Sequence, residues 1–218
     1  MDREPKKIQE SPWAERLNSI THGFGWALSI AALVVMVVFA ALKGTARHVV
    51  GTSIFGATMV LLYAMSTLYH AFRGPRVKKV FRILDHSAIF LLIAGTYTPF
   101  CLTVLRGPWG WTLFGIAWGL AVAGIVFKSV AGPRNKALSM CLYLAMGWLV
   151  LIAVIPLWRA LPAWGLVWLF GGGCCYSLGT VFYAWKRLWF NHAVWHMFVI
   201  AGSACHVVTV MAFLIPWN

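Results

Sequence analysis

The sequence predicts an all-α integral membrane protein, a seven-transmembrane helix bundle with its N-terminus in the cytoplasm and its C-terminus outside. Three observations predict it. Hydrophobic residues make up 61% of the 218 residues and charged residues only 11%, where about 25% charged is typical of soluble proteins. Seven apolar runs reach the length of about 17–25 residues that crosses a bilayer. Basic residues gather in the short segments between those runs.

The elements follow from these runs and from the turn residues between them. Residues 1–18 predict a short cytoplasmic tail, because they mix acidic and basic side chains and lack the apolar middle of a signal peptide. Residues 19–218 predict one seven-transmembrane domain. Gly-Pro pairs at 74–75, 107–108 and 132–133 support three of the breaks. The expected spans are 20–42, 49–72, 84–105, 110–127, 137–157, 163–185 and 191–216.

Two spans contain residues that favour irregular helix geometry. Pro99 lies in the third span, where a kink would be tolerated, and Gly171–Gly173 in the sixth predict a close approach between helices.

The distribution of basic residues sets the orientation. Fourteen of the eighteen Lys and Arg residues lie in the tail and in the second, fourth and sixth loops. The positive-inside rule places these segments in the cytoplasm. Because the net charge of +13 is confined to short loops, it predicts contact with anionic lipid head groups rather than with nucleic acid.

Polar side chains from four spans converge at the cytoplasmic end of the predicted bundle. One histidine begins the first span, a serine and a histidine end the second, an acid and a histidine open the third, and two histidines open the seventh. These residues are His22, Ser66, His70, Asp85, His86, His192 and His196.

Asp85 is the one acid beyond the first fifteen residues. An acid at the boundary of a membrane span indicates a functional site. The alternative is a counter-ion for Lys79 or Arg82.

Three histidines at one depth predict a metal site. His192 and His196 are four residues apart, so they share a helix face, and His70 adds a third imidazole. Three imidazoles and an open position are typical of catalytic zinc, and one zinc ion per chain is expected. Other borderline metals would also suit this set. Without a metal, His192 and His196 would be interfacial histidines near lipid head groups.

The neighbouring polar residues suggest roles around such a metal. Asp85 would take a proton from the activated water, and Ser66 would stabilise a developing oxyanion. Glu15, Asn18 and His22 share one stripe of the first helix. We expect these three residues and His86 to orient the metal-binding and catalytic groups. Alternatively, the stripe on the first helix only satisfies the backbone at its boundary.

Two other cofactors fit less well. His192 and His206 are fourteen residues apart, a separation that suits two haem ligands, but no second helix carries such a pair. We expect His206 to form an internal hydrogen bond instead. Retinal would need a lysine inside a span, whereas Lys186, the last lysine, lies in a loop.

Five motifs occur in order along nearly the whole chain: ERLNSITH at 15–22, STLYH at 66–70, LDH at 84–86, AGTYTPF at 94–100 and NHAVWH at 191–196. In this order they resemble the hemolysin III branch of the progestin and adipoQ receptor (PAQR) family. The resemblance implies a zinc ion in the cytoplasmic leaflet, bound by residues matching His70, His192 and His196. It also implies that the residue matching Asp85 holds a zinc-bound water, with Ser66 matching the serine of the second span.

The resemblance also implies partners and a location. The wider superfamily includes alkaline ceramidases, which implies a membrane lipid or fatty acid as ligand. The short tail and short outward loops argue against a protein hormone. The compact form resembles bacterial members, which implies a multi-pass protein of the bacterial plasma (inner) membrane.

Three functional hypotheses follow. The first is a zinc-dependent hydrolase of a lipid amide or ester in the cytoplasmic leaflet. The second is a non-enzymatic regulator or sensor of membrane state with a structural zinc. The third is a cytolytic protein of hemolysin type. A lipid-sized cavity reaching the metal would favour the first.

Overall fold

The computed structural model describes residues 11–131 and 136–216. Seven helical segments within these ranges are long and apolar enough to cross a membrane, and the described residues form no strand. The seven-transmembrane bundle is therefore confirmed. Its elements are α1 (Pro12–Lys43), α2 (Ala46–Ala71), α3 (Pro75–Leu102), α4 (Pro108–Ala131), α5 (Lys136–Gly147), η2 (Trp148–Ala153), α6 (Val154–Ala160), α7 (Ala163–Ala184), α8 (Asn191–Thr209) and η3 (Val210–Leu214).

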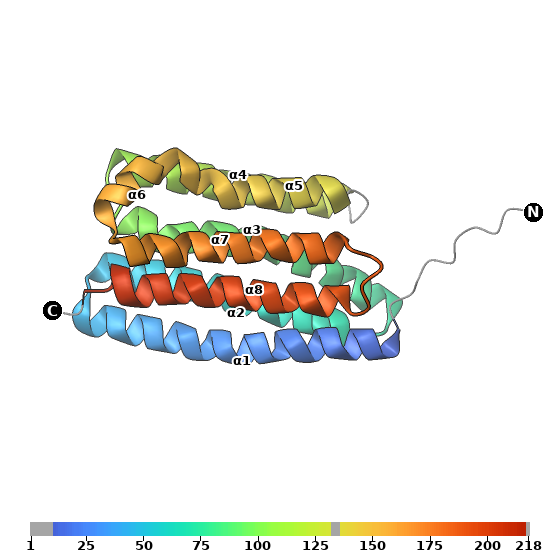
Figure 1. Cartoon of the computed structure of the whole chain (residues 1–218). Helices are drawn as coiled ribbons and strands as arrows, with labels where there is room; N and C mark the ends of the chain where they lie inside the picture. The colour runs from blue at the N-terminus through green and yellow to red at the C-terminus, as the bar shows by residue number, and fades with distance from the viewer. Residues whose placement is uncertain (1–10, 132–135, 217–218) are drawn as a thin grey trace, which may run out of the picture.

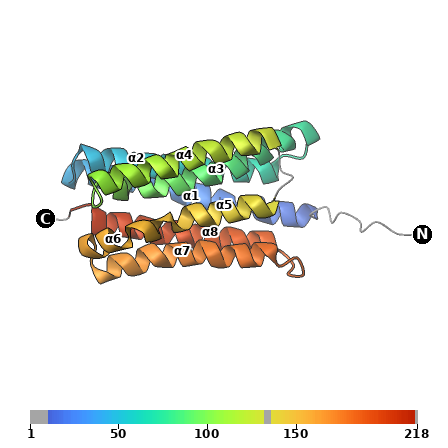
Figure 2. The ribbon, with the colours of Figure 1, turned by 90° about the horizontal axis from the view of Figure 1, so that it is seen from above.

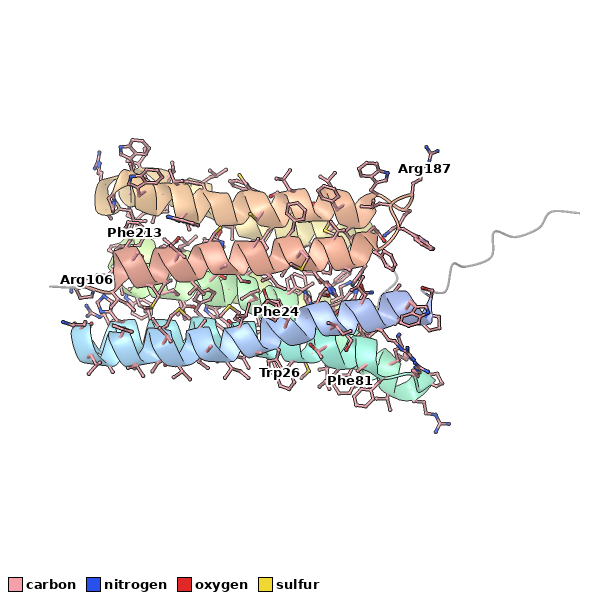
Figure 3. The ribbon with its side chains drawn as sticks, turned by 60° about the horizontal axis from the view of Figure 1, so that its bottom comes forward. Phe24, Trp26, Phe81, Arg106, Arg187 and Phe213 are labelled. Atoms are coloured by element: carbon pink, nitrogen blue, oxygen red, sulfur yellow. The ribbon has the colours of Figure 1, made fainter. Side chains whose placement is uncertain are left out.

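The helices run side by side along one axis (Figure 1, Figure 2). α1 packs against α2 and α8, α2 packs against α3, α3 against α4, and α7 against α8. The beginning of α1 and the end of η3 lie at opposite ends of the bundle, as an odd number of spans requires (Figure 1). Arg187 and Arg106 mark these two ends (Figure 3). Large apolar side chains such as Leu42 and Trp158 stay exposed on the outer face, which is the arrangement that lipid contact favours.

Two helices begin well before their apolar runs. α1 starts at Pro12 instead of residue 20, and α3 starts at Pro75 instead of residue 84. The hydroxyl of Ser11 accepts a hydrogen bond from the backbone N–H of Ala14, and proline occupies the first turn of both helices. The predicted starts were too late because hydropathy locates the part of a helix that lies in lipid, not the polar turns that precede it.

The third and sixth spans are continuous helices, and regular helix is interrupted in the fifth and seventh spans. α3 continues through Pro99, and α7 continues through Gly171–Gly173. The fifth span instead contains the 3₁₀ segment η2 between α5 and α6, and the seventh ends in the π-helical turn η3. The expected close approach occurs at Gly172, where a Cβ would lie 2.7 Å from Nε2 of His206.

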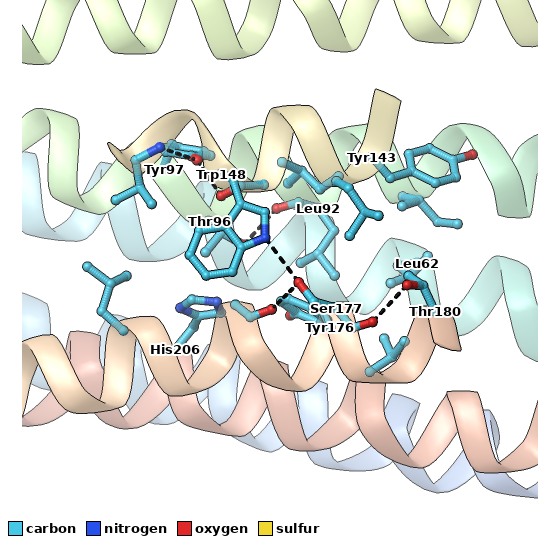
Figure 4. Close-up of a pocket in the computed structure, with 18 of the residues that line it drawn as sticks. Leu62, Leu92, Thr96, Tyr97, Tyr143, Trp148, Tyr176, Ser177, Thr180 and His206 are labelled. Carbon is cyan, nitrogen blue, oxygen red and sulfur yellow. Dashed lines mark hydrogen bonds between the residues drawn. The ribbon is translucent and has the colours of Figure 1, made fainter. Parts of the chain in front are cut away.

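Tyr97 stabilises the break in the fifth span. Its hydroxyl lies within donating distance of the Gly147 and Met146 carbonyls, at 2.7 and 2.9 Å, and accepts from the Val150 N–H at 2.9 Å. These backbone groups lie where the regular helical bonding is interrupted, so the phenol replaces interactions that the break removes. Figure 4 shows Tyr97 and Trp148 on the wall of a pocket between the third, fifth and sixth spans.

Candidate metal centre

Three histidines meet at the end of the bundle where α1 begins. His70 comes from the last turn of α2, and His192 and His196 come from the first two turns of α8. One ring nitrogen of each lies within 4.8 Å of the corresponding nitrogens of the other two. His70 and His196 are buried, and His192 is half-buried. The structure therefore brings together the three residues that the sequence predicted as ligands.

The free nitrogens of these rings fit a metal. The Nε2 atoms of His70, His192 and His196 are buried without a hydrogen-bond partner among residues 11–131 and 136–216. Buried polar atoms in proteins are nearly always paired. Three imidazole nitrogens from two helices are a donor set that zinc accepts. Other borderline metals accept it as well.

Glu15 orients His70. Oε2 of Glu15 accepts a hydrogen bond from Nδ1–H of His70 at 2.9 Å, while Oε1 pairs with Lys78 at 2.7 Å. A histidine that donates from Nδ1 to a carboxylate presents the lone pair of Nε2, as metal-binding histidines commonly do. Glu15 thus makes contacts to α2 and α3, whereas Ser11 satisfies the backbone at the start of α1.

Thr21 orients His196 in the same way, a contact that was not predicted from the sequence. The Thr21 hydroxyl donates to the backbone carbonyl of Asn18 and lies 3.0 Å from Nδ1 of His196. Because the hydroxyl hydrogen is engaged, the oxygen accepts from Nδ1–H, and Nε2 carries the lone pair. Asn18 is buried at 1% exposure and supplies the carbonyl. The spacing of Thr21, three residues after Asn18 on the predicted stripe, is the signal that could have found it.

His22 contacts one of the three histidines, His196, through ring stacking. Its ring lies against that of His196, with centroids 3.4 Å apart and planes 17° from parallel. The ring of Tyr63 meets it edge-on at 5.1 Å. His22 also lines the pocket. His22 therefore contacts His196 through its ring, and neither of its ring nitrogens has a hydrogen-bond partner among the described residues.

Asp85 and Ser66 complete the polar cluster. Oδ2 of Asp85 accepts from Nδ1–H of His86 at 3.0 Å, and Tyr143 donates to the backbone carbonyl of His86 at 2.8 Å. The carboxylate interacts electrostatically with His70. Within the described chain Asp85 pairs with neither Lys79 nor Arg82. Ser66 is buried one helical turn before His70, and its hydroxyl finds no partner among the described residues.

A long apolar pocket starts beside this cluster. Asp85 and His22 line one end, and Phe100, Leu105 and Leu157 lie toward the other. Asp85 and Phe100 are fifteen residues apart on α3, which corresponds to about 22 Å at 1.5 Å per residue. Aromatic and aliphatic side chains of α3, α5 and α7 form most of the wall (Figure 4). The pocket has the length and polarity of a single lipid chain.

Known proteins are similar in sequence to this chain over most of its length. The family model described as "Haemolysin-III related" matches residues 11–207. The chain is 50% identical to "Hemolysin-3" of Bacillus cereus over 93% of this chain and 92% of that protein. It is also 50% identical to the "Hemolysin-3 homolog" of Bacillus subtilis (strain 168), over 92% and 94%.

A more distant similarity extends to animals. The chain is 26% identical to the human "Monocyte to macrophage differentiation factor" over 90% of this chain and 83% of that protein. The bacterial relatives and the seven spans support a multi-pass protein of the bacterial plasma membrane. With the family match covering most of the chain, these comparisons show that the protein belongs to the haemolysin-III related family, the hemolysin III branch of the PAQR family.

Proposed function

We propose that this protein is a zinc-dependent hydrolase that cleaves the amide or ester bond of an acyl lipid. The observation that carries the proposal is the set of three unpaired Nε2 atoms, on histidines of which two interact electrostatically with Asp85, the carboxylate that lines one end of a long apolar pocket. A structural metal needs neither the carboxylate nor the pocket.

Each residue of the cluster has a chemical role in this proposal. His70, His192 and His196 would hold the zinc ion. Bound there, zinc would supply Lewis-acid chemistry that polarises a carbonyl and activates water. Asp85 would accept the proton of the attacking water and return it to the leaving amine or alkoxide, while His86 keeps Oδ2 in place. The unpaired hydroxyl of Ser66 would donate to the oxygen that gains negative charge.

The pocket positions the rest of the substrate. An acyl chain lying along α3 would bring its carbonyl to the end lined by Asp85 and His22. The apolar wall excludes water from the chain, so binding energy from the chain holds the scissile bond in place.

The test combines metal content with turnover of a ceramide-type amide and an acyl ester by the purified chain. Asp85→Asn keeps the shape of the side chain and removes the proton acceptor. We expect it to retain one zinc per chain while the turnover rate falls about 10²–10⁴-fold. His192→Ala combined with His196→Ala should lose both zinc and turnover. His48→Ala is the matched control, since His48 lies at the other end of α2 and bonds to the carbonyl of Leu214.

The outcomes separate the hypotheses. Normal turnover in Asp85→Asn would refute the role of the carboxylate. Zinc-loaded protein that cleaves neither substrate would refute the hydrolase and favour a sensor with a structural zinc.

A further inference from the structure

His206 is a polar side chain in the apolar part of the pocket that the proposed chemistry leaves unused. It lies on α8 ten residues beyond His196, which corresponds to about 15 Å along the helix. Its side chain lines the pocket, and Figure 4 shows it pointing inward among the lining residues. The residue is only 6% exposed.

The surrounding side chains make room for this ring but give it no hydrogen bond. Gly172 on α7 allows the imidazole edge to approach the backbone, because a Cβ there would lie 2.7 Å from Nε2. Tyr176 stacks on the ring with centroids 5.6 Å apart. Nδ1 is buried and unpaired within the described part of the chain. The internal hydrogen bond expected from the sequence is therefore not found.

The other polar groups at this level of the pocket are already paired. The Trp148 indole donates to the hydroxyl of Ser177 at 3.0 Å (Figure 4). The hydroxyls of Tyr176 and Ser203 lie 2.9 Å apart, and Thr96 donates to its own helix at the carbonyl of Leu92. His206 thus differs from its neighbours because it lines the pocket and its side chain has no hydrogen-bond partner among the described residues.

We propose that His206 is a binding subsite for a hydroxyl group carried on the acyl chain of the ligand, so that the preferred ligands are lipids hydroxylated far from the head group. A neutral imidazole has one donor and one acceptor, and a hydroxyl can serve either. An unpaired polar group in apolar surroundings is costly, so a chain that satisfies it gains over a plain chain. About 15 Å corresponds to roughly a dozen carbons in a zigzag chain with bonds of about 1.5 Å.

This inference rests on the proposed lipid pocket, and the test uses binding so that it does not depend on turnover. Affinities of the purified chain are measured for octadecanoic acid and for its 12-hydroxy and 3-hydroxy derivatives. We expect the 12-hydroxy acid to bind about tenfold more tightly than the unsubstituted acid, as one added hydrogen bond to a buried group allows. The 3-hydroxy acid should show no such gain, because its hydroxyl lies near the metal end.

Variants test whether the ring of His206 causes the preference for the 12-hydroxy acid. His206→Leu should bind the 12-hydroxy and unsubstituted acids equally, and His206→Gln should keep part of the preference. His48→Leu, the same change at the outer end of α2, should retain all of it. A preference that survives in His206→Leu overturns the subsite.

The ratios of the wild-type affinities for the three acids test the subsite even if a variant fails to fold. Equal affinity of the wild-type chain for all three acids also overturns the subsite, and the ring would then be satisfied by water. If the wild-type chain binds none of the three acids, the proposed lipid pocket fails together with the subsite.

Discussion

Glu15 and Thr21 lie on the first helix, yet each acts on a histidine of another helix. Glu15 accepts from Nδ1–H of His70, and Thr21 accepts from Nδ1–H of His196. In both cases the contact fixes which ring nitrogen carries the hydrogen and how the ring is turned. The histidines are therefore oriented before any metal arrives.

This orientation predicts a loss of metal affinity when either contact is removed. Glu15→Gln and Thr21→Val should each weaken zinc binding by about 10–100-fold, because a ring free to rotate must be ordered on binding. Competition with a chelator of known affinity measures the change. Ser19→Ala is the control, since the hydroxyl of Ser19 bonds only to the carbonyl of Thr67. Equal affinity in all four proteins would contradict the orienting role.

Residue identity predicted that the three histidines meet, but not every contact that orients them. His70, His192 and His196 could be placed together because loop charges set the depth of each span. The contact between Thr21 and His196 joins residues 175 positions apart, and threonine is common enough in membrane helices to carry no signal alone. The stacking of His22 on His196 was likewise invisible, since it depends on how α1 and α8 are rotated against each other.

At the scale of helices, Gly95 of the AGTYTPF motif shows how closely α2 and α3 approach. A methyl group at Gly95 would collide with the side-chain oxygen of Thr58, which is itself buried. Gly95→Ala should therefore destabilise the fold by about 1–3 kcal/mol. Gly119→Ala is the control, because that position on α4 faces open space. Thermal unfolding in detergent should show a lower midpoint for the first variant only.

Tyr97 gives a second prediction at this scale. Tyr97→Phe removes the hydroxyl that bonds to Gly147 and Val150 across the break in the fifth span. The freed backbone groups should cost about 1–3 kcal/mol, so the Val150 amide should exchange its hydrogen about tenfold faster or more. Thr96→Val, which loses a bond only within α3, should leave this exchange rate unchanged. An unchanged rate in Tyr97→Phe would contradict the bridging role.

The observed helix boundaries show which features hydropathy predicts and which it does not. The seven spans were predictable because each needs a long apolar run. The break at Trp148–Ala153 was not predicted, although Gly147 directly precedes it and Pro156 has no N–H to donate to the carbonyl of Ile152 within it. Tyr97, a residue of another helix, bonds to backbone groups that the break leaves free.

For the whole molecule, the charge distribution predicts the orientation in the membrane. Fourteen of eighteen basic residues lie on the predicted cytoplasmic side, and translocating them would be costly. Alkaline phosphatase, which is active only outside, should be active when fused after Arg106 or residue 216 and inactive when fused after Gly74. The reverse pattern would place the three histidines in the outer leaflet and contradict a cytoplasmic site.

The three clustered histidines also impose an order on biosynthesis. His70 belongs to the second span made by the ribosome, whereas His192 and His196 belong to the last. Chains emerge N-terminal end first, so the set remains incomplete until the final helix has inserted beside α1 and α7. If the proposed metal binds to this set, it can be loaded only on finished chains, and a chain that stalls before α8 stays empty. Bound metal would thus distinguish completed protein from aborted fragments in the membrane.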